Sequence, residues 1–336
     1  MESAVKALLT PGKGLLAADE SIGTIGKRFE ALGIASTEEN RRAYRELLFT
    51  TPGLADHISG AILFDETIRQ STGGEPFPRA LARKGIIPGI KVDKGTAALP
   101  FFEGEKVTQG LDGLRERLAE YRQMGARFTK WRAVIAVGDG LPTPACIGAN
   151  AHALALFAAL SQEAGLVPIV EPEVLMDGDH TLARCGEVTA GVLKTVFAAL
   201  FEHRVRLETM LLKSNMVLPG KDCPQQPAAG EVAEATIRCL RRVVPAAVPG
   251  IVFLSGGQTG VEATQRLNAI CGISGSPWIL SFSFGRALQD DALGAWRGLT
   301  ANAAAAQEAL RHRASCNGLA VQGKHTARAE RERLID

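Results

Sequence analysis

The sequence predicts an α/β fold, a (β/α)8 TIM barrel in which eight parallel strands alternate with helices. Eight short apolar runs follow one another along the chain, and each ends at a polar or glycine-rich turn. The runs are too apolar to alternate cleanly, which is typical of parallel strands that are buried on both faces. No Pro/Ser-rich linker divides the 336 residues. We therefore expect a single barrel domain over residues 1–336, with a short charged C-terminal tail from about residue 325.

The predicted strands and helices alternate through the chain. The strands are Gly14–Asp19, Ile58–Glu66, Ile86–Asp93, Phe128–Val137, Val167–Glu173, Met210–Val217, Ile251–Gly257 and Trp278–Arg286. Longer segments with helical spacing lie between them, and the clearest are Ala149–Gly165, Leu182–Arg206, Glu231–Val244 and Ala287–Arg313. Gly165 closes the first of these helices as a C-terminal cap.

The composition excludes several classes of protein. With 46% hydrophobic and 22% charged residues, the chain has material for a large core, which excludes a disordered or fibrous protein. The 38 basic and 36 acidic residues nearly balance, so we expect no nucleic-acid partner. No apolar run reaches about 18 residues, and the N-terminus lacks a signal-peptide layout. The six scattered cysteines are expected to be reduced, so we expect a cytoplasmic protein without membrane contact.

Charged residues gather at the ends of the predicted strands. In this fold the carboxyl ends of the strands meet at one mouth, where active sites form. Buried strands usually exclude charged residues, because burying an unpaired charge is costly. Here the strand ends carry Asp19, Asp65, Glu66, Lys91, Asp93, Lys130, Arg132, Glu171, Glu173, Lys213 and Arg286. So many charges predict a functional site at the mouth.

Lys213 is the most unusual of these residues, because it interrupts the apolar run MLLKSNMV. One interpretation is a buried lysine that pairs with a carboxylate. The other is a Schiff-base nucleophile. An ordinary lysine is almost fully protonated at neutral pH, and desolvation or a nearby cation increases the neutral fraction. Lys130 is the candidate for that cation.

Glu171 and Glu173 share strand parity, so their side chains are expected on the same face. Two close carboxylates can keep one carboxyl protonated near neutral pH, which suits a general acid/base. The alternative is that both pair with Lys130 and Lys213, and the two interpretations are compatible. Pro172 between them lacks an N–H for the sheet.

Two turns predict anion sites at the mouth. The turn Ser255, Gly256, Gly257 follows the seventh strand and Gly285–Arg286 follows the eighth, where barrels commonly bind phosphate. After the first strand, SIGTIGKR supplies a second candidate site, which Lys91 could close; its residues are Ser21, Thr24, Lys27 and Arg28. The GxxGK spacing is not that of a P-loop.

No metal or organic cofactor is expected. The stretch Asp177–His180 is interpreted as a turn and an N-terminal helix cap rather than as a ligand cluster. The sequence contains no HxH, HExxH or CxxC pattern.

Together these segments resemble the class I fructose-1,6-bisphosphate aldolases, the Schiff-base type that uses no metal. The resemblance extends from about Gly12 to Lys324 and keeps the family's order of motifs. The motifs are LAADES (16–21), ILFDET (62–67), GIKVDKG (89–95), TQGLDGL (108–114), KWR (130–132), VEPEVLMDGDH (170–180), LLKSNMV (211–217), LSGGQ (254–258) and SFSFGRALQ (281–289).

The resemblance implies a role for each candidate residue. Lys213 would form the iminium at C2 of the sugar, with Glu171 as acid/base and with Glu173 and Lys130 tuning the lysine. Asp19 would accept the C4-hydroxyl proton. The C1-phosphate would be held by Ser255, Gly256, Gly285 and Arg286, with Gly257 in the same turn. The C6-phosphate would lie towards Ser21, Thr24 and Lys91, with Arg28 and Arg132 nearby.

The resemblance also implies sugar bisphosphate and triose phosphate ligands, a glycolytic or gluconeogenic role and a homotetramer. Two departures are mild: Ser214 stands where many relatives have Pro, and Thr24 where Ser is common. Eukaryotic relatives end in a tail with a terminal tyrosine, whereas this sequence ends Leu334-Ile335-Asp336 and has tyrosines only at 44 and 121. A sedoheptulose-bisphosphate aldolase, a transaldolase-like enzyme and, last, a non-catalytic scaffold are the alternatives.

Overall fold

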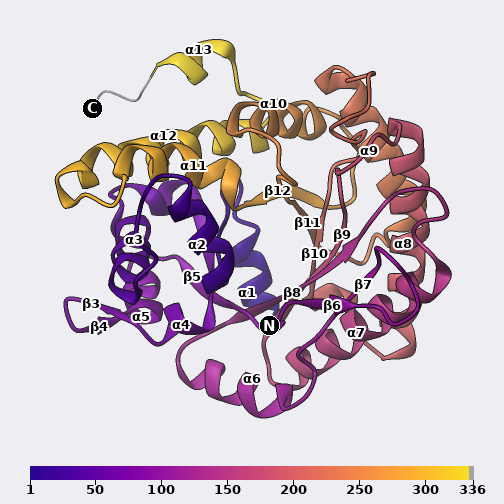
Figure 1. Ribbon diagram of the computed structural model, residues 1–336, viewed down its shortest axis with the longest axis horizontal. Helices are drawn as coiled ribbons and strands as arrows, with labels where there is room; N and C mark the ends of the chain where they lie inside the picture. Colours follow the sequence, from indigo (N-terminus) through magenta and orange to yellow (C-terminus); the bar gives the residue numbers. More distant parts are fainter. Residues whose placement is uncertain (333–336) are drawn as a thin grey trace.

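Eight strands close into one parallel barrel. The computed structural model describes residues 1–332 (Figure 1). The order around the barrel is β1-β12-β11-β10-β9-β8-β5-β2, so the last strand pairs with the first. The barrel strands are β1 (Gly14–Ala18), β2 (Ile58–Leu63), β5 (Ile87–Lys91), β8 (Phe128–Ile135), β9 (Val167–Val174), β10 (Leu211–Ser214), β11 (Gly250–Phe253) and β12 (Ile279–Phe284). The predicted (β/α)8 barrel is confirmed.

Most of the helices form a ring around the strands in Figure 1. The helices of the described residues are α1 (Glu2–Leu8), α2 (Ile22–Glu30), α3 (Glu38–Thr50), α4 (Asp65–Ile68), α5 (Phe77–Arg83), α6 (Leu114–Gln123), α7 (Pro144–Glu163), α8 (Leu182–Glu202), α9 (Ala229–Val243), α10 (Gly260–Cys271), α11 (Arg286–Trp296), α12 (Ala303–Val321) and α13 (Ala327–Arg331). Two hairpins that the sequence analysis missed follow β2 and β5; they pair β3 (Ser71–Thr72) with β4 (Glu75–Pro76), and β6 (Thr96–Ala98) with β7 (Lys106–Thr108).

The polar ends of the first two predicted strands lie just outside the sheet. Asp19 follows the last residue of β1, and the motif containing Asp65 and Glu66 starts the short helix α4 instead of ending β2. The Glu66 carboxylate pairs with Arg41, and its Oε2 lies 2.6 Å from Nη2. These polar side chains therefore belong to the connections above the barrel.

Two predicted helix boundaries are wrong. The single helix expected over Ala287–Arg313 is divided into α11 and α12, because Arg297 and Gly298 adopt left-handed conformations with φ of +50° and +76°. Helix α8 is capped by the Thr181 side chain, which accepts a hydrogen bond from a backbone N–H one turn into the helix. The stretch Asp177–His180 therefore precedes the cap and does not supply it.

Apolar side chains fill the amino-terminal half of the barrel. The Phe128 ring occupies its centre, because β5 has Gly89 beside it; a Cβ added there would lie 2.3 Å from the ring. Helix α1 closes the same end, and in Figure 1 it lies near the centre of the ring. This inner cluster includes Val5, Leu8, Leu15, Ile62, Phe128, Val167, Ile169, Leu211 and Val252. The opposite half is thereby left for polar side chains.

Helix α7 belongs to the barrel wall. Among the described helices, it alone is long and apolar enough to cross a membrane by length and composition, with a mean hydropathy of 1.4. It packs against β8, β9 and α8, and half of its apolar window is buried within the protein. Burial of this kind is typical of a core helix.

The charged C-terminal tail contains helix α13, which lies outside α10 and α12 in Figure 1. Glu330 connects it to α12, because its Oε1 lies 2.6 Å from Nη2 of Arg313. The Oε2 of Glu330 lies 3.0 Å from Nε2 of His325. The segment Leu334-Ile335-Asp336 lies outside the described residues.

Candidate active site

Strand periodicity changes the interior from apolar to charged towards the carboxyl ends. On β8 the inward side chains are Phe128, then Lys130, and on β10 they are Leu211, then Lys213. A cavity of about 1230 Å³ opens where these charged residues lie. Its lining includes every residue predicted for catalysis or binding except Gly257: Asp19, Ser21, Thr24, Arg28, Lys91, Lys130, Arg132, Glu171, Glu173, Lys213, Ser255, Gly256, Gly285 and Arg286.

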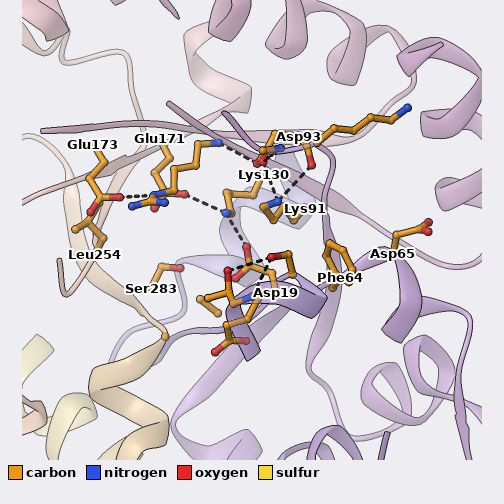
Figure 2. A pocket seen from close by; sticks show the side chains of 18 of the residues that line it. Asp19, Phe64, Asp65, Lys91, Asp93, Lys130, Glu171, Glu173, Leu254 and Ser283 are labelled. Carbon is orange, nitrogen blue, oxygen red and sulfur yellow. Dashed lines mark hydrogen bonds and ion pairs between the residues drawn. The ribbon is translucent and has the colours of Figure 1, made fainter. Parts of the chain in front are cut away.

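Four buried charges form a continuous chain at the base of the cavity. Lys213 Nζ lies 3.0 Å from Glu171 Oε1, and Lys130 Nζ lies 3.3 Å from Glu171 Oε2. Lys130 Nζ also lies 2.6 Å from Asp19 Oδ2. Figure 2 shows Asp19, Lys130 and Glu171 directed towards one another from separate strand ends. Two cations and two anions thus alternate, and no charge in the chain is left without an opposite partner.

This chain of four buried charges keeps Asp19 ionised and Lys130 protonated. Burial by itself would raise the pKa of the Asp19 carboxyl, but the charges of Lys130, Lys213 and Lys91 lower it to about 2. Burial would lower the pKa of the Lys130 ammonium, but Asp19 and Glu171 raise it well above its usual range. Asp19 is therefore a carboxylate at neutral pH and can accept a proton.

The two glutamates of β9 have separate cationic partners. Both side chains face the cavity, as their parity predicts, and both are buried. Glu171 bridges the two lysines, whereas Glu173 forms a short ion pair with Nε of Arg132. The predicted pairing of both glutamates with Lys130 and Lys213 therefore holds for Glu171 alone.

A second ion pair borders the chain on β5. Lys91 Nζ lies 2.8 Å from Asp93 Oδ1 and 5.7 Å from the centre of the Phe64 ring, which stands beside it in Figure 2. Asp93 is buried and also accepts a hydrogen bond from the Arg132 backbone N–H at 3.2 Å. Asp93 thus fixes Lys91 at the edge of the cavity.

One of the two predicted anion-binding ends lies where β11 and β12 finish. Gly256 and Gly257 adopt φ of +60° and +98°, which only glycine accommodates easily, and Gly285 directly precedes helix α11. Arg286 is exposed and makes no ion pair within residues 1–332. Gly257 lies just outside the cavity lining, with Lys221 Nζ 3.3 Å from where its Cβ would be. Backbone N–H groups at the start of α11 and the Arg286 guanidinium suit a phosphate.

The other end lies at the start of helix α2. Ser21 caps this helix, because its Oγ accepts a hydrogen bond from the Thr24 N–H at 3.3 Å. Lys27 also lines the cavity. Arg28 was expected beside a phosphate, but its guanidinium already forms a short ion pair with Glu20 and lies 2.9 Å from Asp290. Arg28 is thus held by carboxylates, and Ser21, Thr24 and Lys27 are the freer donors.

Some cavity residues were missed by the sequence analysis. Ser283 Oγ is buried and has no hydrogen-bond partner in the described part of the chain. The alternation SFSF on β12 could have placed this serine inward, because Phe282 and Phe284 occupy the opposite face. Lys94 and Tyr121 line the cavity from a turn and from α6, and no strand pattern predicts them.

A compact metal-ligand cluster was also missed. Within residues 1–332, His312, Cys316 and Glu330 have ligand atoms within 4.8 Å of one another. The cluster joins α12 to α13, and none of its residues lines the cavity. Both Glu330 oxygens already accept hydrogen bonds from Arg313, at 2.6 and 3.0 Å. The Glu330 carboxylate is therefore already neutralised by Arg313, and we interpret the cluster as part of an ion-pair network rather than as a metal site.

Comparison with known proteins assigns the family. Residues 1–334 match the family model described as fructose-bisphosphate aldolase class-I. This chain belongs to the class I fructose-bisphosphate aldolase family. A probable class 1 fructose-bisphosphate aldolase of Xanthomonas campestris pv. campestris is 58% identical over 321 residues, which are 95% of this chain and 96% of that protein. The resemblance stated from the motifs is thereby confirmed.

Two further relatives of this aldolase come from eukaryotes. The cytoplasmic isozyme of fructose-bisphosphate aldolase of Cicer arietinum is 53% identical over 324 residues, which are 96% of this chain and 90% of that protein. The structure of Plasmodium falciparum fructose-bisphosphate aldolase, solved in a ternary complex with TRAP and a small-molecule inhibitor, superposes with a TM-score of 0.95. It shares 49% identity and covers 97% of this chain, which covers 95% of it. The whole aldolase barrel is therefore shared.

Proposed function

We propose that this chain cleaves fructose 1,6-bisphosphate reversibly into dihydroxyacetone phosphate and glyceraldehyde 3-phosphate through a Schiff base on Lys213. The observation that carries the proposal is the buried alternating chain of Lys213, Glu171, Lys130 and Asp19, which lines one cavity with the residues of the two proposed phosphate-binding ends. A Schiff-base lyase for a sugar bisphosphate needs all three parts: an amine, a base and two phosphate sites.

The first step forms the covalent intermediate. The neutral amine of Lys213 attacks C2 of the ketose, and the carbonyl oxygen receives a proton to give a carbinolamine. Glu171, whose Oε1 lies 3.0 Å from Nζ, gives and takes the protons, so that water leaves and the iminium forms. Lys130 places a positive charge on the other side of Glu171, with its Nζ 3.3 Å from Oε2.

The second step breaks the C3–C4 bond. Asp19 takes the C4-hydroxyl proton, the C4 aldehyde departs as glyceraldehyde 3-phosphate, and the bond electrons move into the iminium to give an enamine. The low pKa of the Asp19 carboxyl, about 2, keeps it ionised for this step. Protonation at C3 and hydrolysis of the iminium then release dihydroxyacetone phosphate and restore the amine.

The two ends of the cavity orient the substrate. Gly285, Arg286 and the Ser255–Gly256 turn would bind the C1-phosphate, and Ser21, Thr24 and Lys91 would face the C6-phosphate. Glu173 positions Arg132, and Arg28 acts through Glu20 and Asp290. We further propose a metal-independent cytoplasmic enzyme of glycolysis and gluconeogenesis that works as a homotetramer of single-domain subunits, in keeping with the family.

Steady-state cleavage of fructose and sedoheptulose bisphosphates, with and without a chelator, tests the proposal. We expect turnover of fructose 1,6-bisphosphate that the chelator leaves unchanged, and little turnover of unphosphorylated ketoses. Loss of activity that added metal restores would contradict the Schiff-base route. Preference for unphosphorylated ketoses would favour a transaldolase-like enzyme instead.

A further inference from the structure

Gln289 occupies a buried position between the two anion-binding ends. It lies on α11, one helical turn after Arg286, and its side chain is fully buried. Its Nε2 donates to Ala17 O at 2.7 Å and to Glu20 Oε1 at 3.1 Å. Its Oε1 accepts from the Tyr44 hydroxyl at 3.1 Å and from Arg28 Nη1 at 3.4 Å. An amide has two donor hydrogens and two acceptor lone pairs, so the hydrogen-bonding capacity of Gln289 is fully used.

These bonds connect elements that carry different phosphate contacts. Arg286 starts α11, which follows β12 directly, whereas Glu20 and Ser21 form the connection from β1 to α2. The bond to Ala17 reaches the strand that ends beside Asp19. Gln289 therefore joins the helix at the C1-phosphate end to the connection that carries the C6-phosphate end.

The Glu20 carboxylate, which accepts a hydrogen bond from Gln289, extends this set of side-chain contacts. It forms a short ion pair with Arg28 and lies 2.8 Å from Arg45 Nη2 on α3, and the side chains of Glu20 and Arg45 are 10% and 3% exposed. Asp290, the next residue on α11, also contacts Arg28, at 2.9 Å. Side-chain contacts of Glu20, just before α2, and of Arg28, in its last turn, thus tie this part of the molecule to α3 and α11.

We propose that Gln289 is a positioning residue that sets the separation of the two phosphate-binding ends and thereby the preference for a bisphosphate over a monophosphate. The inference rests on the proposed function. Without the amide, Ala17 and Glu20 lose their hydrogen bonds to α11, and Arg28 keeps only its contact with Asp290 on that helix, so the C6-phosphate contacts weaken first. The contacts of the C1-phosphate and the Lys213 chain do not involve Gln289.

The test compares kcat/KM for fructose 1,6-bisphosphate with kcat/KM for fructose 1-phosphate. Gln289→Met keeps the side-chain length and removes the hydrogen bonds. We expect the bisphosphate-to-monophosphate ratio to fall about 10-fold or more, equivalent to about 1.4 kcal/mol in the barrier, through a raised KM for the bisphosphate. Tyr44→Phe removes one donor and keeps the ring stacked on Trp296, so it should lower the ratio less.

Gln307→Met is the matched control. Gln307 also ties two helices together, because its Nε2 donates to Leu47 O at 3.1 Å and to Thr50 Oγ1 at 3.0 Å, but it does not line the cavity. In Gln307→Met the ratio of kcat/KM for the bisphosphate to kcat/KM for the monophosphate should equal that of the wild type. An unchanged ratio in folded Gln289→Met, or equal losses on both substrates, would overturn the positioning role. Failure of the wild-type enzyme to cleave the bisphosphate would overturn the proposed function instead.

Discussion

Replacing Lys130 by methionine removes the central cation of the buried chain. Its Nζ lies 2.6 Å from Asp19 and 3.3 Å from Glu171, so the variant leaves two buried carboxylates with Lys213 as their remaining close cation. Breaking a buried ion pair by removing one partner costs about 3–5 kcal/mol. We expect the free energy of unfolding at neutral pH to fall by about that amount.

The same substitution changes the ionisation of Asp19. In the wild type the pKa of this carboxyl is about 2 in the folded state, against about 3.9 when unfolded. A lowered folded-state pKa contributes about 2–3 kcal/mol of stability, which is present above the unfolded pKa and is lost as the pH falls from about 4 to about 2. In Lys130→Met the pKa of Asp19 should rise, because burial, the strongest influence on this group, is then opposed only by Lys213 and Lys91.

The assay is the pH dependence of kcat for bisphosphate cleavage. The Asp19 carboxylate should cause no acid limb in the wild type above about pH 4, whereas Lys130→Met should show a new one there. Lys91→Met is the control, because Lys91 pairs with Asp93 and acts less strongly on Asp19 than Lys130 and Lys213 do. An acid limb in Lys130→Met that matches the wild type would refute the coupling of Lys130 to Asp19.

Three further predictions concern other parts of the molecule. Glu171→Gln should lower kcat by roughly 10²–10⁴-fold, and a loss below about 10-fold would reject its acid/base role. Arg286→Ala should raise KM by about 10-fold or more with a smaller change in kcat, because charged hydrogen bonds contribute about 1.5–3 kcal/mol. Deletion from Arg328 onwards should leave cleavage within about threefold, less than 1 kcal/mol in barrier, since no described residue of α13 lines the cavity. Differential scanning calorimetry of that deletion should show a lower Tm, because Arg313 loses its Glu330 partner, and an unchanged Tm would contradict this contact.

The barrel and the identity of the buried charges could be predicted from the sequence. Strand parity alone places Lys130 and Lys213 on the inward face, and the barrel rule brings all strand ends to one mouth. The same rules could have found Ser283. The break between α11 and α12 was not predicted. Arg297 and Gly298 adopt left-handed conformations there, and two such residues hardly change the hydrophobic periodicity of the surrounding helical sequence.

The pairing of the charges could not be predicted. Arg28 contacts Glu20 eight positions away and Asp290 from the far end of the chain, so no local spacing identifies its partners. Glu173 pairs with Arg132 on the neighbouring strand β8, although the strand register sets Arg132 opposite Glu171 and Glu173 opposite Val134. Such choices depend on register and on helix packing, which become visible only in three dimensions.

Covalent trapping tests the central claim most directly. The enzyme is incubated with dihydroxyacetone phosphate and borohydride, and the modified peptide is identified, with Lys213→Met as the control. Borohydride reduces the iminium to a stable amine, so we expect loss of activity and one adduct on Lys213, absent from the variant. An adduct mainly on Lys91 or Lys130, or full activity after treatment, would contradict the assignment of Lys213 as the nucleophile.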